Sequence, residues 1–147
     1  GMIWKPRTTV AAVIQHNDQF LLVEEEIRGK LTLNQPAGHL EPDESLIEAV
    51  IRETQEETAW QFTPEHLVGI YRWIHPLKGD TYIRYCFSGQ ATQHDPTQAL
   101  DDDIHQALWL TYEQIEARYT DLRSPLVLEC FQDYMAGHRY PLDILHN

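Results

Sequence analysis

The chain has 147 residues, 42% of them hydrophobic, and a formal net charge of −12, which fits one domain over residues 1–147 with its own core. This charge argues against long nucleic acids and anionic membranes as partners, because both require Lys and Arg patches. No run is apolar enough for a membrane span or a signal sequence. Cys86 and Cys130 lack metal-ligand spacing and predict buried thiols in a reducing compartment, hence a cytoplasmic protein. Gly1 before Met2 is interpreted as a residue left by cloning.

The N-terminal part of the chain predicts a β-hairpin followed by a third strand. Residues 8–15 and 20–23 are apolar runs that flank the turn-forming pair Asn17-Asp18, which is typical of a hairpin. The three glutamates at 24–26 predict an edge or a loop. Residues 31–35 predict a short strand.

A helix is predicted from about Asp43 to Thr58. Asp43 and Ser45 are both suited to cap its N-terminus. Apolar residues such as Val50 and Ile51 lie within one arc of the helix, which can therefore pack on a sheet.

Three carboxylates, Glu53, Glu56 and Glu57, occupy positions i, i+3 and i+4 of this helix. Residues at these spacings are neighbours on one face, and like charges there repel each other. A hard divalent cation, which takes oxygen ligands, would compensate the repulsion. A solvated acidic face on an ordinary surface helix is the alternative for such a triplet alone.

The remainder of the chain predicts more strands and two further helices. Thr111 opens a capping-box pattern and Ser124 precedes Pro125, so each marks a helix start, the second helix ending near Gly137. A mixed sheet flanked by helices, an α/β sandwich, is the expected fold. The expected strands are 67–75, 81–91 and 107–110, with a polar loop over 93–103.

The glycine and the charged residues around this helix resemble the Nudix box. That motif reads Gly, five residues, Glu, seven residues, Arg-Glu, an aliphatic, any residue, Glu-Glu, any residue, Gly, an aliphatic. Its charged residues and first glycine are all present here: Gly38, Glu44, Arg52, Glu53, Glu56 and Glu57.

Three positions depart from the box. Thr54 and Trp60 stand where aliphatic residues are usual, and Ala59 replaces the final glycine. If the helix ends there with a positive φ, Ala59 carries a steric cost that glycine would not. None of the three is an expected ligand, so the departures concern local stability more than chemistry.

The resemblance implies a Nudix-type α/β/α sandwich around a mixed β-sheet and hydrolysis of small diphosphates assisted by Mg²⁺, with Mn²⁺ able to substitute. Shorter motifs at 33–41, 73–74, 122–127 and 139–142 are similar to the NudJ branch of the family. That similarity implies nucleoside di- and triphosphates, thiamine pyrophosphate and its pyrimidine pyrophosphate precursor as substrates. It also implies release of orthophosphate. The protein is expected to be a monomer or a homodimer.

The box residues divide by role. Glu56 and Glu57 are assigned as metal ligands, and Glu53 as a ligand or as the group that orients the attacking water. By resemblance, the backbone carbonyl of Ala37 completes the metal site. Arg52 is assigned to position Glu53, since a guanidinium can hold a carboxylate through two hydrogen bonds.

Two more box residues are interpreted as structural. These are Gly38 and Glu44, the latter holding either the loop or Arg52. A simple first-turn acid is an equal alternative for Glu44.

In the resembling family a further carboxylate often comes from a loop across the site. The run Asp101–Asp103 is the candidate here, and Asp103 is chosen by its offset from Trp109. A solvated acidic turn is the alternative.

Six residues are candidates for substrate binding. Trp73 and Tyr82 could stack on a planar ring, although packing within the sheet is the more common role of strand aromatics. Arg123 could meet a phosphate at a helix start or pair with a surface acid. The others flank the box and are expected to face the cleft: Asn34, Gln35 and His39, the last also a candidate acid–base group.

Three functions therefore compete. The first is the phosphohydrolase just described. The second keeps the fold but acts on ADP-ribose or a nucleotide sugar. The third is a non-catalytic nucleotide-binding regulator with a Nudix-like fold, against which the intact acidic residues argue.

Overall fold

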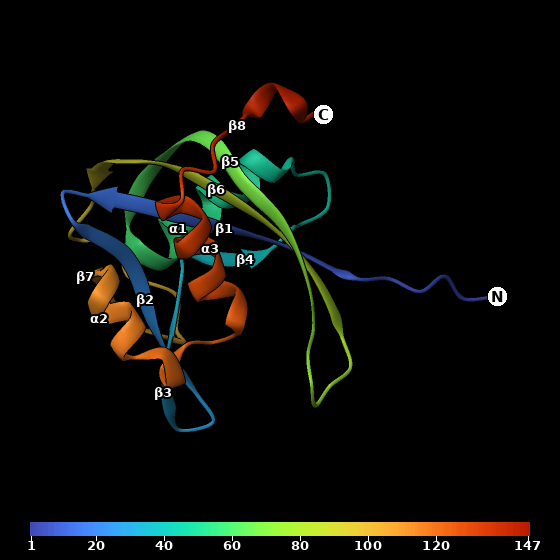
Figure 1. The fold of residues 1–147 in the computed structure, drawn as a ribbon, viewed down its shortest axis with the longest axis horizontal. Helices are drawn as coiled ribbons and strands as arrows, with labels where there is room; N and C mark the ends of the chain where they lie inside the picture. The colour runs from blue at the N-terminus through green and yellow to red at the C-terminus, as the bar shows by residue number, and fades with distance from the viewer.

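The computed structural model describes residues 1–147 and has a mixed β-sheet between helical layers (Figure 1). The strands run in the order β3-β2-β1-β6-β5-β8, while β4 also pairs with β1 and β7 with β2. Strands β1 and β6 are parallel, and the other strand pairs are antiparallel. The strands are β1 (Arg7–His16), β2 (Gln19–Ile27), β3 (Lys30–Asn34), β4 (Ala37–His39), β5 (Trp60–Ile74), β6 (Thr81–His94), β7 (Ile104–Thr111) and β8 (Tyr140–Pro141).

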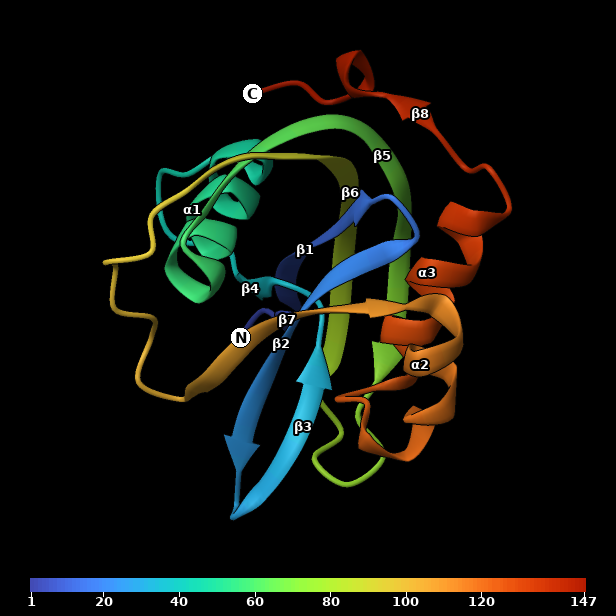
Figure 2. The ribbon, with the colours of Figure 1, turned by 90° about the vertical axis from the view of Figure 1, so that its left-hand side faces the viewer.

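One helix covers one face of the sheet, and two cover the other (Figure 2). These helices are α1 (Leu46–Thr58), α2 (Tyr112–Ala117) and α3 (Pro125–Met135), with short 3₁₀ turns at Tyr119–Asp121 and Leu142–Ile144. The expected α/β/α sandwich is confirmed. No helix is both long and apolar enough to cross a membrane.

Each face of the sheet has its own hydrophobic cluster. Val50 of α1 packs with Leu21 and Phe87 on one face. Phe131 of α3 packs with Phe20 and other residues on the opposite face. Burial of large side chains on both faces stabilises the three layers by roughly 1.5–3 kcal/mol for each such side chain.

Local signals place the helices as predicted. Ser45 caps α1 and accepts a hydrogen bond from the Glu48 amide. Thr111 caps α2 through a capping box, and Ser124 caps α3 with Pro125 in the first turn.

The prediction for the three glutamates at 24–26 was wrong. They continue β2, which pairs with β3 on one side and with β7 on the other. Glu24 and Glu25 are 6% and 5% exposed. Their charges are compensated by Arg118, which lies 3.3 Å from Glu24, and by Arg123, which lies 3.0 Å from Glu25.

Two strand boundaries also differ from the prediction. β5 begins at Trp60 rather than at residue 67, and it contains irregular register near Pro64, which cannot donate a ladder hydrogen bond. β6 extends to His94, which shortens the loop before β7.

Candidate active site

Helix α1 presents the acidic residues at its C-terminal half, and its end is built on an unusual residue. Ala59 has φ 61° and ψ 16°, and its amide donates to the carbonyl of Gln55. The left-handed conformation is therefore present at the position where the Nudix box has glycine. Because Ala59 is 2% exposed, its methyl group is also buried.

Arg52 gathers the charged residues of the box. Its Nε and Nη2 donate to the two carboxylate oxygens of Glu44 at 2.6 and 3.0 Å. Its Nη1 lies 2.6 Å from Glu53 and 3.3 Å from Glu56, and Nη2 also donates to the carbonyl of His39. One guanidinium thus fixes two acidic side chains of α1 and the strand beside them. The bond to Arg52 lowers the pKa of Glu44.

Gly38 allows β4 to approach α1 closely. A Cβ atom at Gly38 would lie 2.1 Å from the Glu53 carboxyl carbon, a distance that no side chain can adopt without moving Glu53. The motif glycine is therefore required by the position of this carboxylate rather than by its own backbone angles.

Glu57 is the most deeply buried of the three acids. It is 6% exposed, and its Oε1 accepts a hydrogen bond from the Ala37 amide at 2.9 Å. Burial is the main cause that raises the pKa of Glu57 to about 9, with further contributions from the charges of Glu25, Glu53 and Asp101. Burial likewise raises the pKa of Glu53, against the lowering effect of Arg52. The protein therefore holds carboxylates where negative charge is costly.

The register of β4 determines where the Ala37 carbonyl points. Val10 lies opposite Gly38 and Ala11 opposite Ala37, and the Ala12 amide bonds to the carbonyl of Pro36. Hydrogen-bonded and non-hydrogen-bonded pairs alternate in an antiparallel ladder, so Ala37 directs both backbone groups away from β1. Its amide reaches Glu57 on that side, and its carbonyl opens toward the same acidic region.

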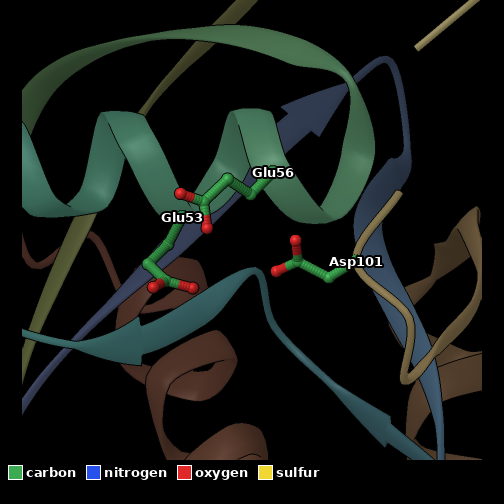
Figure 3. Close-up of side chains that lie close together, drawn as sticks. All are labelled: Glu53, Glu56 and Asp101. Carbon is green, nitrogen blue, oxygen red and sulfur yellow. The ribbon is translucent and has the colours of Figure 1, made fainter. Parts of the chain in front are cut away.

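The loop before β7 supplies a fourth carboxylate. Asp101 lies with Glu53 and Glu56, with one oxygen from each residue within 4.8 Å of the others (Figure 3). The Asp101 amide donates to the carbonyl of Glu56, which fixes the loop to α1. Burial, followed by the charge of Glu56, raises the pKa of Asp101. Asp103, the residue chosen from the sequence, lines the same cavity but lies outside this three-carboxylate cluster.

A cavity of about 420 Å³ adjoins the acidic residues. Most of the predicted substrate residues line it: Asn34, His39, Trp73, Tyr82 and Arg123. Trp73 and Tyr82 lie opposite each other on β5 and β6, with ring centroids 5.8 Å apart. Burial and the nearby Arg7 and Arg123 lower the pKa of His39.

Gln35 does not line this cavity, although the sequence suggested that it would face the cleft. It is completely buried. Its amide nitrogen donates to the carbonyl of Ala12 at 3.2 Å, and its Oε1 accepts from Arg84 at 2.8 Å. Gln35 therefore contacts Arg84, a residue that lines the cavity, and does not face the cavity itself.

The sequence did not single out two buried charged residues that line the cavity, Glu25 and Arg84. Glu25 pairs with Arg123 at 3.0 Å, and burial raises the pKa of its carboxyl group. Arg84 was a usable signal, because it lies within the predicted strand 81–91, and a charged residue in the interior of a sheet must be compensated or functional.

The fold and the acidic helix define a Nudix hydrolase. The NUDIX domain family model matches residues 5–129, and the chain belongs to this family. Nudix hydrolases generally use divalent metals, and the carboxylate oxygens gathered here are suitable ligands for such ions.

Three known proteins are similar to this chain in sequence or in structure. Phosphatase NudJ of Escherichia coli (strain K12) is 44% identical over 143 residues, which are 97% of this chain and 92% of that protein. A NUDIX hydrolase from Nitrosomonas europaea is 53% identical with a TM-score of 0.95, covering 97% of both chains. The NUDIX domain of Shewanella oneidensis NrtR, solved with ADP ribose, has a TM-score of 0.72 at 17% identity over 91% of this chain and 89% of that one, and shares the fold.

Proposed function

We propose that this chain is a magnesium-dependent phosphohydrolase of small diphosphates. The observation that carries the proposal is the cluster of Glu53, Glu56 and Asp101, whose oxygens lie within 4.8 Å of one another beside a cavity of about 420 Å³. Three oxygen donors without a neighbouring thiol or imidazole suit Mg²⁺, and Mn²⁺ as its substitute.

A bound Mg²⁺ at this cluster supplies charge neutralisation for phosphate oxygens and activation of water. The side chains of Glu53, Glu56 and Asp101, together with the Ala37 carbonyl, are the groups that would hold it. Glu57 contributes through its bond to the Ala37 amide, which fixes that strand, and as a ligand once its proton is lost.

Arg52 and Glu44 act on the geometry of the site. Arg52 holds Glu53 at 2.6 Å and is itself held by Glu44 through two hydrogen bonds. Glu53 is thereby kept in place to bind the ion or to orient the attacking water. Gly38 leaves the space that this arrangement needs.

The proposed role of the loop before β7 is shared between two aspartates. Asp101 serves the metal cluster, because it is the one whose carboxylate reaches Glu53 and Glu56. Asp103 lines the cavity and stays the proposed catalytic carboxylate on the substrate side.

The proposed substrates are nucleoside di- and triphosphates, thiamine pyrophosphate and its pyrimidine pyrophosphate precursor, with release of orthophosphate. The identity over nearly the whole chain to a protein named phosphatase NudJ supports the release of orthophosphate. Trp73 and Tyr82 supply an aromatic surface for a ring, and Arg123 and Lys78 supply cations at the cavity for phosphate oxygens.

Orthophosphate and pyrophosphate release over a panel of these substrates, with and without chelator, tests the proposal. Activity should require Mg²⁺ or Mn²⁺, and full activity after exhaustive chelation would refute the metal role. Hydrolysis of ADP-ribose to two monophosphates in preference to the panel would favour the second function. Glu56→Gln should lower turnover by orders of magnitude, whereas Glu48→Gln, on the exposed start of the same helix, should not.

A further inference from the structure

Arg84 is a buried cation that forms no salt bridge, although its charge partly offsets the rise that burial causes in the pKa of the nearby Glu25 carboxyl group. It lies on β6, is 7% exposed, and lines the cavity. Its Nη1 donates to Oε1 of Gln35 at 2.8 Å, its Nε has no hydrogen-bond partner, and it takes part in none of the ion pairs of the protein. A guanidinium is always charged and carries five N–H donors; those on Nη1 and Nη2 can serve both Gln35 and a further acceptor, while the donor on Nε has no partner.

A buried Nε without a hydrogen-bond partner is costly in the free protein. Buried polar groups are nearly always hydrogen-bonded, and exceptions call for an explanation. A second exception lines the same cavity, since Oδ1 of Asn34 is also buried without a partner. Two residues with an unsatisfied polar atom therefore line one cavity, which makes this wall the candidate contact for a polar group of a ligand.

The position of Arg84 on β6 indicates which part of a ligand it meets. Side chains alternate between the faces of a strand, so Tyr82 and Arg84 lie on the same face, with Cα atoms roughly 6.6 Å apart. Trp73 lies opposite Tyr82 in the register. A planar ring held against Trp73 and Tyr82 can therefore present its edge to Arg84.

The acidic cluster lines the cavity from other elements of the fold. Glu53 and Asp101 line the cavity from α1 and from the loop before β7, and the phosphates of a substrate belong at that side. Arg123 already pairs with Glu25, and Lys78 lies on the exposed turn after β5. Arg84 is thus the buried donor beside the aromatic pair.

We propose that Arg84 is a specificity-determining residue that donates a hydrogen bond to an acceptor atom on the edge of a planar nitrogen heterocycle in the substrate. This rests on the proposed function, whose substrate range it narrows. A substrate without such an acceptor leaves the guanidinium unpaired in the complex, and sites built on buried polar groups discriminate strongly for this reason. Gln35 is a positioning residue that holds Nη1 of Arg84.

Binding calorimetry with non-hydrolysable ligands in Mg²⁺ tests the proposal. The probes are methylenediphosphonate, its benzyl ester, and the α,β-methylene analogues of CDP and ADP. The wild-type protein should bind at least one nucleotide analogue more tightly than the benzyl ester. Because binding needs no turnover, the result is separate from any failure of the protein to hydrolyse diphosphates.

Arg84→Gln should lower the affinity for that nucleotide analogue by roughly 10- to 100-fold, which is the range for a hydrogen bond to a charged group. Binding of methylenediphosphonate and of its benzyl ester should change by less than about threefold, which also shows that the variant is folded. Arg84→Lys, which keeps the charge, is a second variant. It too should weaken binding of the nucleotide analogue more than binding of the other two probes. Arg72→Gln, at an exposed position on β5, is the matched control and should change nothing.

Three results would overturn the proposal. Equal weakening of all probes would assign Arg84 to phosphate binding or to structure. No weakening of any probe would remove it from the site. A wild-type protein that binds the benzyl ester as tightly as both nucleotide analogues would show that no ring-edge acceptor is recognised.

Discussion

Glu57→Gln should change how the stability of the metal-free protein depends on pH. Glu57 is buried, and its pKa is raised to about 9 from an ordinary value of 4.5. Between these two values the folded protein holds a proton that the unfolded chain has lost. Stability therefore falls as pH rises through this window, because folding must take up a proton that becomes scarcer as pH rises.

The size of the effect is bounded by one proton. A difference of one bound proton corresponds to about 1.4 kcal/mol per pH unit, so Glu57 accounts for at most about 2.7 kcal/mol between pH 6 and pH 8. A domain is typically stable by roughly 5–15 kcal/mol, so a loss of this size is readily measured. Glutamine keeps the oxygen that accepts from the Ala37 amide at 2.9 Å and carries no charge at any pH in this range.

Urea unfolding in chelator at pH 6, 7 and 8 measures the difference between the two proteins. The gain in the free energy of unfolding of Glu57→Gln over wild type should grow with pH. Glu48→Gln, which removes an exposed charge from the same helix, serves as control and should show no such growth. Addition of Mg²⁺ should stabilise wild type more at pH 8 than at pH 6, since the ion compensates the buried charge. A gain independent of pH would refute the assignment of the raised pKa to Glu57.

Four further variants test single features of the site. Gly38→Ala should lower turnover by about 100-fold, because the new Cβ displaces the Glu53 carboxylate and misplacement by about 1 Å has such effects; a variant with wild-type kcat would contradict the close approach. Asp101→Asn should raise the Mg²⁺ concentration required more than Asp103→Asn does, and the reverse order in metal titrations would return the ligand role to Asp103. Ala59→Gly relieves a left-handed residue but removes a buried methyl group, so the free energy of unfolding should rise by no more than about 1 kcal/mol, with turnover unchanged. A melting curve that shows a large destabilisation would mean that the methyl contact outweighs the strain.

Features that depend on neighbours in the sequence could be predicted. Ser45, Thr111 and Ser124 each cap the helix that follows, because a cap is a contact between residues two or three positions apart. The spacing of the acidic residues on α1 followed from the helical period alone. The order of the predicted strands and helices indicated the sandwich fold, and the family motif implied the same arrangement.

Features that depend on distant partners could not be predicted. Glu24 and Glu25 were predicted to lie in an edge or a loop, because three consecutive acids are unfavourable in an isolated strand. The compensating residues Arg118 and Arg123 lie 94 and 98 positions away. Only the folded chain brings them to β2, so the charge pattern of residues 24–26 by itself gave the wrong element.

The loop aspartates were ambiguous for the same reason. Three consecutive residues point in different directions, and an offset from Trp109 does not determine which one reaches α1. The bond between the Asp101 amide and the carbonyl of Glu56 decides the direction. It places the Asp101 carboxylate with Glu53 and Glu56, while Asp103 lines the cavity.

In the proposed site, the acidic residues near α1 and the buried Arg84 line one cavity, and together they would select a whole substrate rather than a part of it. The carboxylates near α1 are costly without a cation, and burial raises the pKa of Glu53, Glu57 and Asp101 alike. Arg84 is costly without an acceptor. A metal ion alone satisfies the first group, and a ring alone satisfies the second. Only a ligand that joins a metal-bound diphosphate to an acceptor-bearing ring relieves both costs at once, so affinity should depend on the two halves being connected.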